Sequence, residues 1–343
     1  MAQSALELAN EAVAARQDLT QNQAAAALAV IMAGEASEEQ ISALLLGLRE
    51  KGETVDELAG LAETMRSLAT PVKPQRTDLL DTCGTGGGRR TFNISTTAAL
   101  IAAAAGCAVA KHGNRTATGL SGSADVLEAL GAKLELTPQD EARLIDEVGF
   151  GFMFAPAHHA ATRYVVPVRK ALGVPTIFNL LGPLTNPAGA RRQLIGVPQP
   201  ASIDLVAGAL SRLGTDHALV VSSEDGLDEI STSGPTQVAE LTAEGTRRYT
   251  LTAEQFGIEP ASEDELSGGG PEQNAEIIRQ IFAGESGPRR EIAALNAGAA
   301  IYVAGRAGSI AEGLELARET IDSGAAQGTL EDFLQRSTEL SAR

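Results

Sequence analysis

Residues able to bind phosphate are concentrated in the stretch Asp81–Gly131. An apolar run over Leu79–Cys83 has the character of a strand, and Gly84–Gly88 follows it. Glycines take positive φ without steric cost and let the backbone approach an anion closely. Thr91–Thr96 then offers amide and hydroxyl groups immediately before an alanine-rich segment expected to be helical. The dipole and free amides of that helix would point toward the same anion.

The second half of this stretch adds positive charge. A strand is expected over Cys107–Ala110, and Lys111–Arg115 follows it with three potential cations and an amide. Ser121–Ser123 then begins another helix. Because loops at the carboxyl ends of parallel strands meet in one crevice, we predict a single site for a polyanionic, phosphorylated ligand. The alternative is that the glycines mark ordinary turns and that Lys111–Arg115 is a solvated loop.

A carboxylate-rich loop, Glu224–Glu229, follows a strand expected over His217–Ser222. Mg²⁺ prefers such hard oxygen ligands and usually shares them with substrate phosphates, so we predict a Mg²⁺ site here. A plain acidic surface loop is the alternative. The adjacent His158 and His159 cannot share one face of a helix, and we predict no zinc site around them.

The composition excludes several classes of protein. The 343 residues are 43% hydrophobic without tryptophan, which predicts a large aliphatic core. No run approaches the roughly 20 apolar residues of a membrane span, and the first residues lack the pattern of a secretion signal. Cys83 and Cys107 occupy strand-like apolar positions, which indicates reduced thiols and a cytoplasmic protein. A net charge of −17 argues against nucleic-acid binding.

The pattern of elements divides the chain near residue 72. Residues 3–70 have helical periodicity and three capping boxes, beginning at Thr20, Ser37 and Thr54. We interpret this part as a packing or dimerisation domain rather than a catalytic one. Pro71–Pro74 would link it to the remainder. The predicted domains are a helical domain over 1–72, completed by a segment near 165–190, and an α/β domain over 73–343.

Beyond Asp78, short apolar runs alternate with helical segments. This alternation predicts the α/β class, with a mainly parallel central sheet covered by helices. Residues 232–265 are polar and strand-like, which favours antiparallel strands at one edge of the sheet. The other elements expected are a strand over 150–155 and helices over 137–148, 203–213, 272–282, 291–305 and 309–340.

Six motifs, taken in order, resemble the anthranilate phosphoribosyltransferase family over nearly the whole chain. The resemblance implies a small helical domain, a large α/β domain and a homodimer formed through the helical part. It also implies the joining of anthranilate to 5-phosphoribosyl 1-diphosphate (PRPP), with Mg²⁺ as cofactor, pyrophosphate as product and a place in tryptophan synthesis. The motifs are Gly84–Gly87, Thr91–Thr96, Lys111–Arg115, Ser121–Asp125, Asn179–Pro187 and Gly226–Glu229.

The resemblance further implies residue roles, which suit a reaction that builds negative charge on a leaving pyrophosphate. Ser95, Asp228 and Glu229 match the Mg²⁺ positions. Gly84, Asn114 and Arg169 match those that hold anthranilate, and a guanidinium suits its carboxylate. No general base is assigned, because the amine is already nucleophilic and positioning can suffice. The PRPP positions are Gly84, Gly87, Gly88, Thr91, Asn93, Ile94, Ser95, Thr96, Lys111, His112, Gly113, Asn114, Arg115, Thr118, Gly119 and Ser123.

Two departures from the family pattern keep other functions open. The glycine-rich loop is one residue shorter and lacks an aspartate, which leaves Arg89 and Arg90 as candidates for contacting phosphate. Thr118 and Gly119 stand where the family usually has two serines. A non-catalytic or nucleic-acid-binding paralogue therefore remains an alternative. A pyrimidine nucleoside phosphorylase shares the architecture but lacks the motifs over Lys111–Arg115 and Asn179–Pro187.

Overall fold

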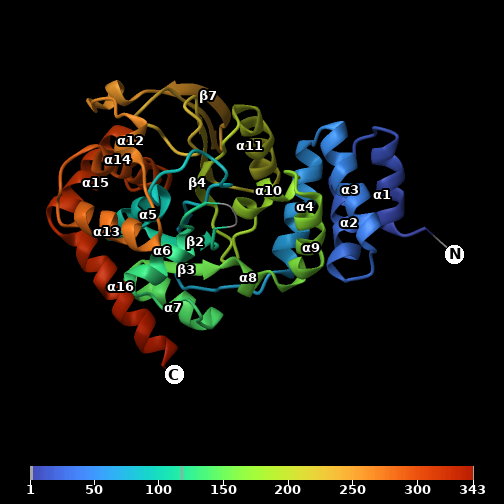
Figure 1. The fold of residues 1–343 in the computed structure, drawn as a ribbon, viewed down its shortest axis with the longest axis horizontal. Coiled ribbons are helices and arrows are strands. Elements are labelled where there is room, and N and C mark those ends of the chain that lie inside the picture. The colour runs from blue at the N-terminus through green and yellow to red at the C-terminus, as the bar shows by residue number, and fades with distance from the viewer. Residues whose placement is uncertain (1–2, 117–118, 343) are drawn as a thin grey trace.

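The computed structural model describes residues 3–116 and 119–342 (Figure 1). A helical bundle stands at one end, and a seven-stranded sheet with its covering helices makes up the rest. The strands are β1 (Leu79–Asp81), β2 (Ala108–Gly113), β3 (Phe150–Phe154), β4 (Arg192–Gly196), β5 (His217–Ser223), β6 (Thr236–Thr242) and β7 (Gly245–Leu251). The α-helices are α1 (Ala5–Ala14), α2 (Gln21–Met32), α3 (Glu38–Lys51), α4 (Val55–Leu68), α5 (Ile94–Ala104), α6 (Ser123–Leu130), α7 (Pro138–Val148), α8 (Ala155–His158), α9 (Val166–Leu172), α10 (Phe178–Leu181), α11 (Ile203–Arg212), α12 (Glu263–Leu266), α13 (Pro271–Phe282), α14 (Pro288–Val303), α15 (Ile310–Asp322) and α16 (Ala325–Ser341). Short 3₁₀ helices cover Ala160–Tyr164, Gly182–Leu184, Pro200–Ser202 and Ala253–Phe256.

Helices α1–α4 form the bundle, and a capping box begins each of them. At the start of α2, α3 and α4, the hydroxyl of Thr20, Ser37 or Thr54, respectively, accepts a hydrogen bond from the amide three residues later, as predicted. A further capping box at Ser4, which begins α1, was not predicted. These caps satisfy amides that a helix start leaves unpaired, so local sequence sets where each helix begins.

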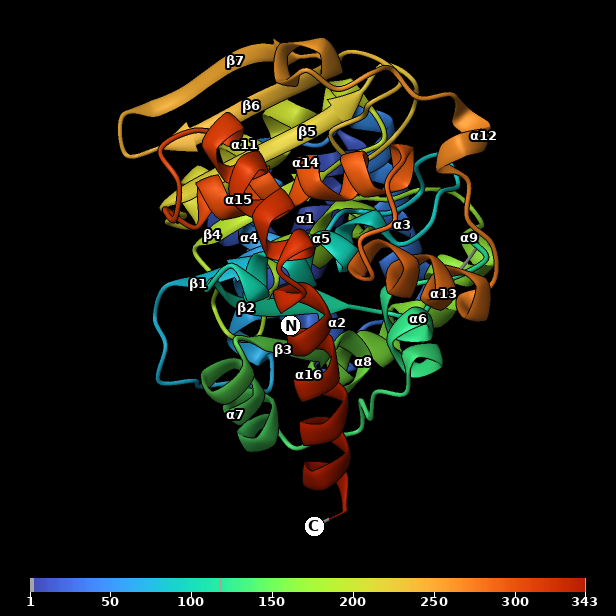
Figure 2. The same ribbon diagram turned by 90° about the vertical axis from the view of Figure 1, so that its left-hand side faces the viewer.

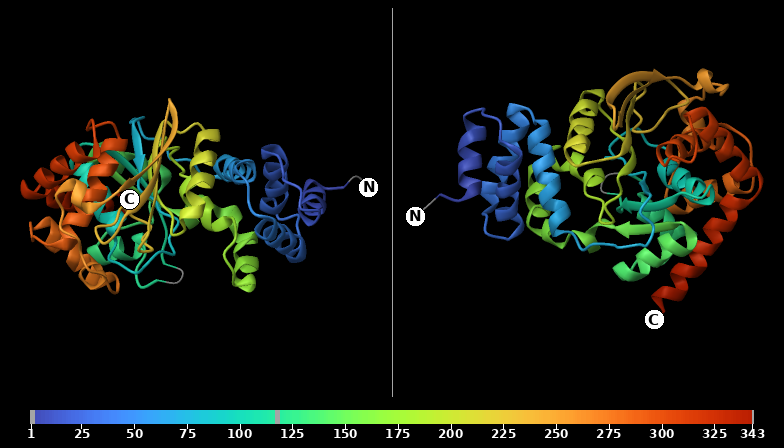
Figure 3. Two further views of the ribbon diagram at one scale, coloured as in Figure 1. Left: turned by 90° about the horizontal axis from the view of Figure 1, so that it is seen from above. Right: turned by 180° about the vertical axis from the view of Figure 1, so that it is seen from behind.

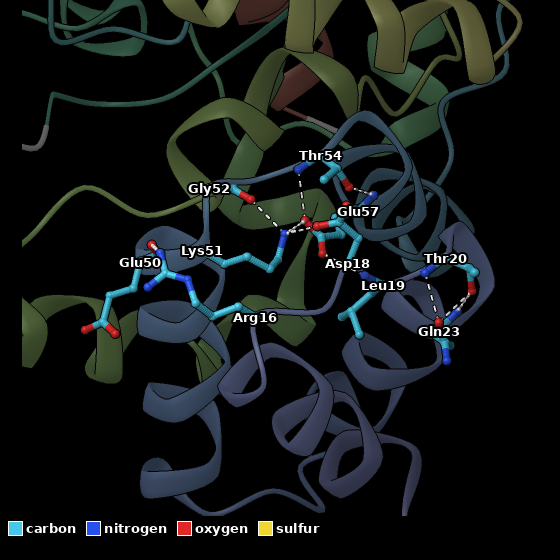
Figure 4. Close-up of polar contacts among 10 residues, drawn as sticks. All are labelled: Arg16, Asp18, Leu19, Thr20, Gln23, Glu50, Lys51, Gly52, Thr54 and Glu57. Atoms are coloured by element: carbon cyan, nitrogen blue, oxygen red, sulfur yellow. Dashed lines mark hydrogen bonds and ion pairs between the residues drawn. The ribbon is translucent and has the colours of Figure 1, made fainter.

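A cluster of ionised side chains, with Lys51 and Glu57 buried and Asp18 exposed, ties the two inter-helix connections of the bundle together (Figure 4). Glu57, which is fully buried, accepts the amides of Leu19 and Thr54, each at 2.9 Å. Lys51 Nζ lies 3.1 Å from Glu57 Oε2 and 2.8 Å from Asp18 Oδ1. The cluster thereby fixes the α1–α2 connection against the α3–α4 connection.

The sheet has the strand order β3-β2-β1-β4-β5-β6-β7. The first five strands in this order are parallel, whereas β6 and β7 are antiparallel. The α/β class and the antiparallel edge within 232–265 are therefore confirmed. The central strand β4 was not predicted, and the helix expected over 309–340 is divided into α15 and α16 at Ser323 and Gly324.

Helices cover both faces of the sheet. Figure 2 shows α13–α16 in front of the sheet, on the side opposite the bundle. Figure 3 shows α11 between the sheet and the bundle. Side chains of β5 alternate accordingly: Leu219 and Val221 join the core with α5 and α14, whereas Ala218 and Val220 join the core with α11 and the bundle. Within the described residues, no helix is both long enough and apolar enough to cross a membrane.

Candidate active site

The Gly84–Gly88 loop begins where β1 ends and lies beside the end of β4. The Thr85 amide donates to the Gly196 carbonyl oxygen at 2.9 Å, which joins the loop to β4. Gly86 and Gly87 have φ of 68° and 86°, in the left-handed region that favours glycine. The loop thus presents bare backbone at the carboxyl end of the sheet, where ligands of open α/β sheets bind.

The acidic loop Glu224–Glu229 packs directly against this bare backbone. A Cβ built on Gly88 would overlap the Asp228 carboxylate, and one on Gly196 would overlap the Asp228 carbonyl. A Cβ on Gly84 would lie 3.2 Å from Asp228 Oδ2. The absence of side chains at three glycines therefore sets where Asp228 stands.

The three predicted Mg²⁺ residues, Ser95, Asp228 and Glu229, meet at this point. The Ser95 amide donates a hydrogen bond to the Glu229 carboxylate. Burial raises the pKa of Asp228, and burial together with repulsion from Asp228 raises the pKa of Glu229 to about 8. Two neighbouring carboxylates that repel each other, with Lys111 as the cation acting on Glu229, form a site that favours a further cation.

Mg²⁺ fits this donor set. Two carboxylates and a hydroxyl are hard oxygen ligands, and Mg²⁺ is usually held by one or two carboxylates together with substrate phosphates. Its charge would also offset the repulsion between Asp228 and Glu229. In the part of the chain that the structure describes, no three or more His, Cys, Asp or Glu side chains gather as a metal site.

The prediction that Lys111–Arg115 is a loop is wrong for its first three residues. Strand β2 continues through Gly113 because it pairs with the whole of β3. Lys111 is 1% exposed, and its Nζ donates to the Thr82 carbonyl oxygen at 2.7 Å. The same Nζ lies 3.5 Å from Ser95 Oγ. Lys111 is therefore a buried cation beneath the N-terminus of α5, not a surface one.

A buried polar network beside Lys111 was not predicted. The His112 amide donates to Asp81 Oδ1 at 3.2 Å, and Asn186 Nδ2 donates to Asp81 Oδ2 at 2.8 Å. His112 Nδ1 lies 3.1 Å from the Gly182 carbonyl oxygen. Burial lowers the pKa of His112 to about 3 and raises the pKa of Asp81 to about 6. His112 is thus neutral, and its buried hydrogen bonds stabilise the ends of β1 and β2.

The N-terminus of α5 is held by residues from two other helices. Asn93 Nδ2 donates to the Ser121 carbonyl oxygen at 3.2 Å, at the start of α6. Asn274 of α13 donates to Asn93 Oδ1 at 2.8 Å and accepts the Gly269 amide at 2.8 Å. Asn274 was not predicted as a site residue. The preceding run of glycines is the only sequence signal that could have drawn attention to it.

Three further PRPP candidates line the start of α5 in different ways. The side chains of Ile94 and Thr96 are buried, so only backbone atoms of these residues could face a ligand. Thr91 is half-buried, and its hydroxyl donates to the Phe92 carbonyl oxygen at 3.0 Å. This end of α5 therefore offers mainly backbone to a ligand, which is how helix N-termini bind phosphate.

The remaining PRPP candidates surround the end of β2. Ser123 Oγ donates to the Asn114 carbonyl oxygen at 3.3 Å, which joins α6 to the chain leaving β2. The Gly119 amide donates to Thr116 Oγ1 at 2.7 Å. A backbone amide therefore makes a hydrogen bond at a position where the family usually has a serine hydroxyl. Thr118 lies outside the described residues.

Two candidate arginines already have partners. Arg115 forms an ion pair with Glu128 at 2.6 Å. Arg169 Nη2 donates to Asn179 Oδ1 at 3.4 Å, and its guanidinium lies over the Phe178 ring, 5.6 Å from the ring centroid. These contacts hold the guanidinium of Arg169 in one orientation at the edge of α9.

Arg169 belongs to the bundle side of the site. Helix α9 packs against α3, and α10 packs against α4. Arg66 of α4 donates to the Leu184 carbonyl oxygen at 2.6 Å, which ties the turn-rich segment after α10 to the bundle. Among the described residues, no hydrogen bond or ion pair joins Arg169 to Gly84 or Asn114, its expected partners in binding anthranilate.

Comparison with known proteins identifies the family. Models of the glycosyl transferase family match residues 9–69 as its helical bundle domain and residues 76–327 as its a/b domain. The anthranilate phosphoribosyltransferase of Symbiobacterium thermophilum is 52% identical over 320 residues, covering 93% of this chain and 94% of that protein. The chain belongs to the anthranilate phosphoribosyltransferase family. The resemblance that six motifs indicated is confirmed.

Solved structures of this family share the whole fold. The anthranilate phosphoribosyltransferase of Thermus thermophilus matches with a TM-score of 0.91 at 45% identity, covering 96% of this chain and 99% of that one. The Saccharomyces cerevisiae enzyme in complex with PRPP and Mg matches with a TM-score of 0.90 at 26% identity, covering 98% of both chains. The same yeast enzyme has also been solved with 4-fluoroanthranilate.

Proposed function

We propose that this protein transfers the 5-phosphoribosyl group of PRPP to the amine of anthranilate and releases pyrophosphate, a step of tryptophan biosynthesis. One observation carries the proposal: the Gly84–Gly88 loop, the N-terminus of α5 and the carboxylates of Asp228 and Glu229 lie together at the end of the sheet. A diphosphate substrate that binds with Mg²⁺ needs both anion-binding amides and acidic metal ligands. The names of relatives at about half identity support the same reaction.

The residues assigned to PRPP would act by holding the leaving pyrophosphate. Backbone amides of the Gly84–Gly88 loop and of α5 are fixed donors, and they stabilise negative charge without reorganising as it develops. Mg²⁺ bound by Ser95, Asp228 and Glu229 would supply positive charge against the phosphate oxygens. Lys111 adds a fixed charge from beneath Ser95. The protein therefore needs no covalent nucleophile.

Anthranilate is assigned to Gly84, Asn114 and Arg169. A guanidinium binds a carboxylate in a fixed geometry, and Arg169 is held in place by Asn179. The amine of anthranilate attacks without prior deprotonation, so alignment of the two substrates provides much of the rate. Arg169 lies on the bundle side of the molecule and Gly84 and Asn114 lie on the sheet side, so both sides would contribute to the anthranilate site.

The same proposal includes the setting of the reaction. The helical domain spans residues 1–72 with the segment near 165–190, the PRPP-binding domain spans 73–343, and two copies associate through the helical domain. The protein acts in the cytoplasm, and neither nucleic acid nor a membrane is its partner. Two buried or half-buried cysteines without a disulfide support a reducing compartment.

The experiment that tests the reaction follows the fluorescence of anthranilate in the presence of PRPP and Mg²⁺. Consumption that depends on PRPP is expected for the wild type. Arg169→Ala should raise the KM for anthranilate at least about tenfold with a smaller effect on the KM for PRPP. Asp228→Ala combined with Glu229→Ala should instead change the Mg²⁺ dependence.

The pattern of losses separates the candidate functions. A folded wild type that consumes no anthranilate under any Mg²⁺ concentration would contradict the reaction and favour a non-catalytic paralogue. Retention on nucleic acid at physiological salt would then identify a nucleic-acid-binding paralogue. Phosphate-dependent cleavage of a pyrimidine nucleoside would instead identify the phosphorylase.

A further inference from the structure

Arg89 joins the glycine-rich loop to the acidic loop. Its amide donates to the Gly226 carbonyl oxygen at 2.9 Å. Its Nη1 lies 2.9 Å from Glu263 Oε1 and 3.5 Å from Asp225 Oδ2. The side chains of Arg89 and Asp225 are 17% and 13% exposed, so this ion pair is largely withdrawn from solvent. One residue thus contacts the acidic loop through both its backbone and its side chain.

Asp225 in turn organises the chain that leads to the Mg²⁺ candidates. Its Oδ1 accepts the Leu227 amide at 3.2 Å, and its Oδ2 accepts the Ser231 hydroxyl at 2.7 Å. These two bonds bracket Asp228 and Glu229 on either side. Whatever fixes Asp225 therefore fixes the turn on which both carboxylates stand.

The guanidinium of Arg89 faces the protein rather than an incoming ligand. Its Nε, Nη1 and Nη2 atoms are all buried and make no hydrogen bond to any residue that the structure describes, so its side-chain contacts are the ion pairs with Asp225 and the exposed Glu263. Attraction between charges is stronger when they are partly withdrawn from water. Arg90, the next residue, is exposed, and no ion pair holds it among the described residues. The two adjacent arginines therefore have different roles.

We propose that Arg89 is a positioning residue that holds the Glu224–Glu229 loop against the Gly84–Gly88 loop before PRPP and Mg²⁺ bind. It acts through Asp225 and Gly226, and it does not contact phosphate. The inference deepens the proposed function and rests on it for its kinetic consequences. Its structural consequence, an acidic loop ordered by Arg89, holds whatever the reaction.

Hydrogen exchange of the ligand-free protein tests the structural consequence. Arg89→Met removes the charge and keeps the length of the side chain, and Arg90→Met is the matched control at the exposed neighbour. Amides of residues 224–231 should exchange at least about tenfold faster in Arg89→Met and unchanged in Arg90→Met. Equal exchange in Arg89→Met and wild type, or equal acceleration in both variants, would overturn the proposal.

Kinetics of a double-mutant cycle test the route through Asp225. Arg89→Met and Asp225→Asn should each raise the half-saturating Mg²⁺ concentration and the KM for PRPP about tenfold, with a smaller change in kcat. Because both act on one turn, the double variant should be no worse than the more impaired single variant. Additive losses would mean that Arg89 contacts the substrate independently, which would sink the proposal.

Two safeguards keep the result interpretable. If Arg89→Met does not fold, Arg89→Lys takes its place, because lysine keeps the charge but loses the broad guanidinium. Amides of residues 224–231 should then exchange faster than in the wild type, and exchange at the wild-type rate would refute the positioning role. If the wild type consumes no anthranilate, the proposed function fails, while exchange over 224–231 still decides the role of Arg89.

Discussion

The position of the Asp228 carboxylate depends on glycines that leave no room for even one methyl group. A Cβ on Gly88 would overlap this carboxylate, and a Cβ on Gly196 would overlap the backbone carbonyl of the same residue. Such an overlap is relieved by moving either the glycine-rich loop or the carboxylate. Both groups lie on loops, and either movement would displace the carboxylate relative to the Gly84–Gly88 backbone.

Gly88→Ala should therefore impair Mg²⁺ and PRPP binding more than it impairs folding. Overpacking of this kind costs about 1–2 kcal/mol, which corresponds to roughly tenfold weaker binding if the carboxylate is displaced. The measurement is the half-saturating Mg²⁺ concentration at fixed PRPP, beside a thermal melt. Gly328→Ala, at an open position in α16, is the control and should leave the kinetics unchanged. Unaltered Mg²⁺ dependence in Gly88→Ala would contradict the argument.

The residue types that gather at the candidate site were predictable from the sequence, but their burial was not. Gly84–Gly88, Ser95, Asp228 and Glu229 come together as the sequence suggested. Lys111 was expected in a loop that follows a strand over Cys107–Ala110, whereas it is buried within β2. Its burial depends on Thr82, a partner that only the pairing of β1 and β2 brings into reach. Contacts between residues distant in sequence leave no local pattern to detect.

At the scale of elements, Glu240 joins the antiparallel edge of the sheet to the helix beneath it. This residue of β6 is fully buried, and its carboxylate contacts donors from three neighbouring elements. Burial alone would raise the pKa of Glu240, but these hydrogen bonds outweigh burial and lower it to about 2. The donors are His217 of β5, Arg247 and Tyr249 of β7, and Tyr302 of α14.

The lowered pKa makes the stability of this edge depend on acid. A carboxyl that titrates lower in the folded than in the unfolded state stabilises the fold above its unfolded pKa, near 4.5, and loses that contribution as pH falls toward 2. Glu240→Gln should cost about 2 kcal/mol at pH 7, because it removes a charge that buried donors need. Its stability should then fall less steeply than that of the wild type between pH 5 and 3. Urea unfolding at pH 7, 5 and 3 measures both the loss of stability at pH 7 and the dependence of stability on pH. The prediction would be refuted if the stabilities of Glu240→Gln and the wild type fell in parallel.

The elements that sequence patterns missed share a common cause. Strand β4 begins with Arg192 and Gln193, polar residues that disguise a central strand. Gln193 is fully buried because its Nε2 donates to the Pro183 carbonyl oxygen at 2.7 Å. Elements with a clear local signal were predicted correctly, such as the bundle helices that begin after Thr20, Ser37 and Thr54 and the antiparallel strands β6 and β7. Buried polar residues in a central strand are recognised only from their distant partners.

At the scale of the molecule, the proposed homodimer needs an apolar surface on the helical bundle. Leu8 of α1 and Val166 of α9 are 51% and 53% exposed, which is unusual for large apolar side chains. Leu8→Glu should convert the dimer into a monomer, because a dimer interface cannot accommodate an unpaired charge. Light scattering coupled to size-exclusion chromatography measures the mass. Leu120→Glu changes an equally exposed leucine away from the bundle and should leave the mass of the dimer intact; dimeric Leu8→Glu would place the interface elsewhere.

The apolar core described for α11 and the bundle has a consequence for how the chain unfolds. Leu28, Leu45 and Leu58 of the bundle belong to the same continuous cluster as Val206 of α11 and Val220 of β5. Removing the bundle would expose one face of the sheet to water, so we expect the two parts to unfold together. Two family models match the helical part and the α/β part of the chain separately. Calorimetry should nevertheless find a single cooperative transition. The boundary between the two matched domains, near residue 70, is thus not expected to separate two independently unfolding units.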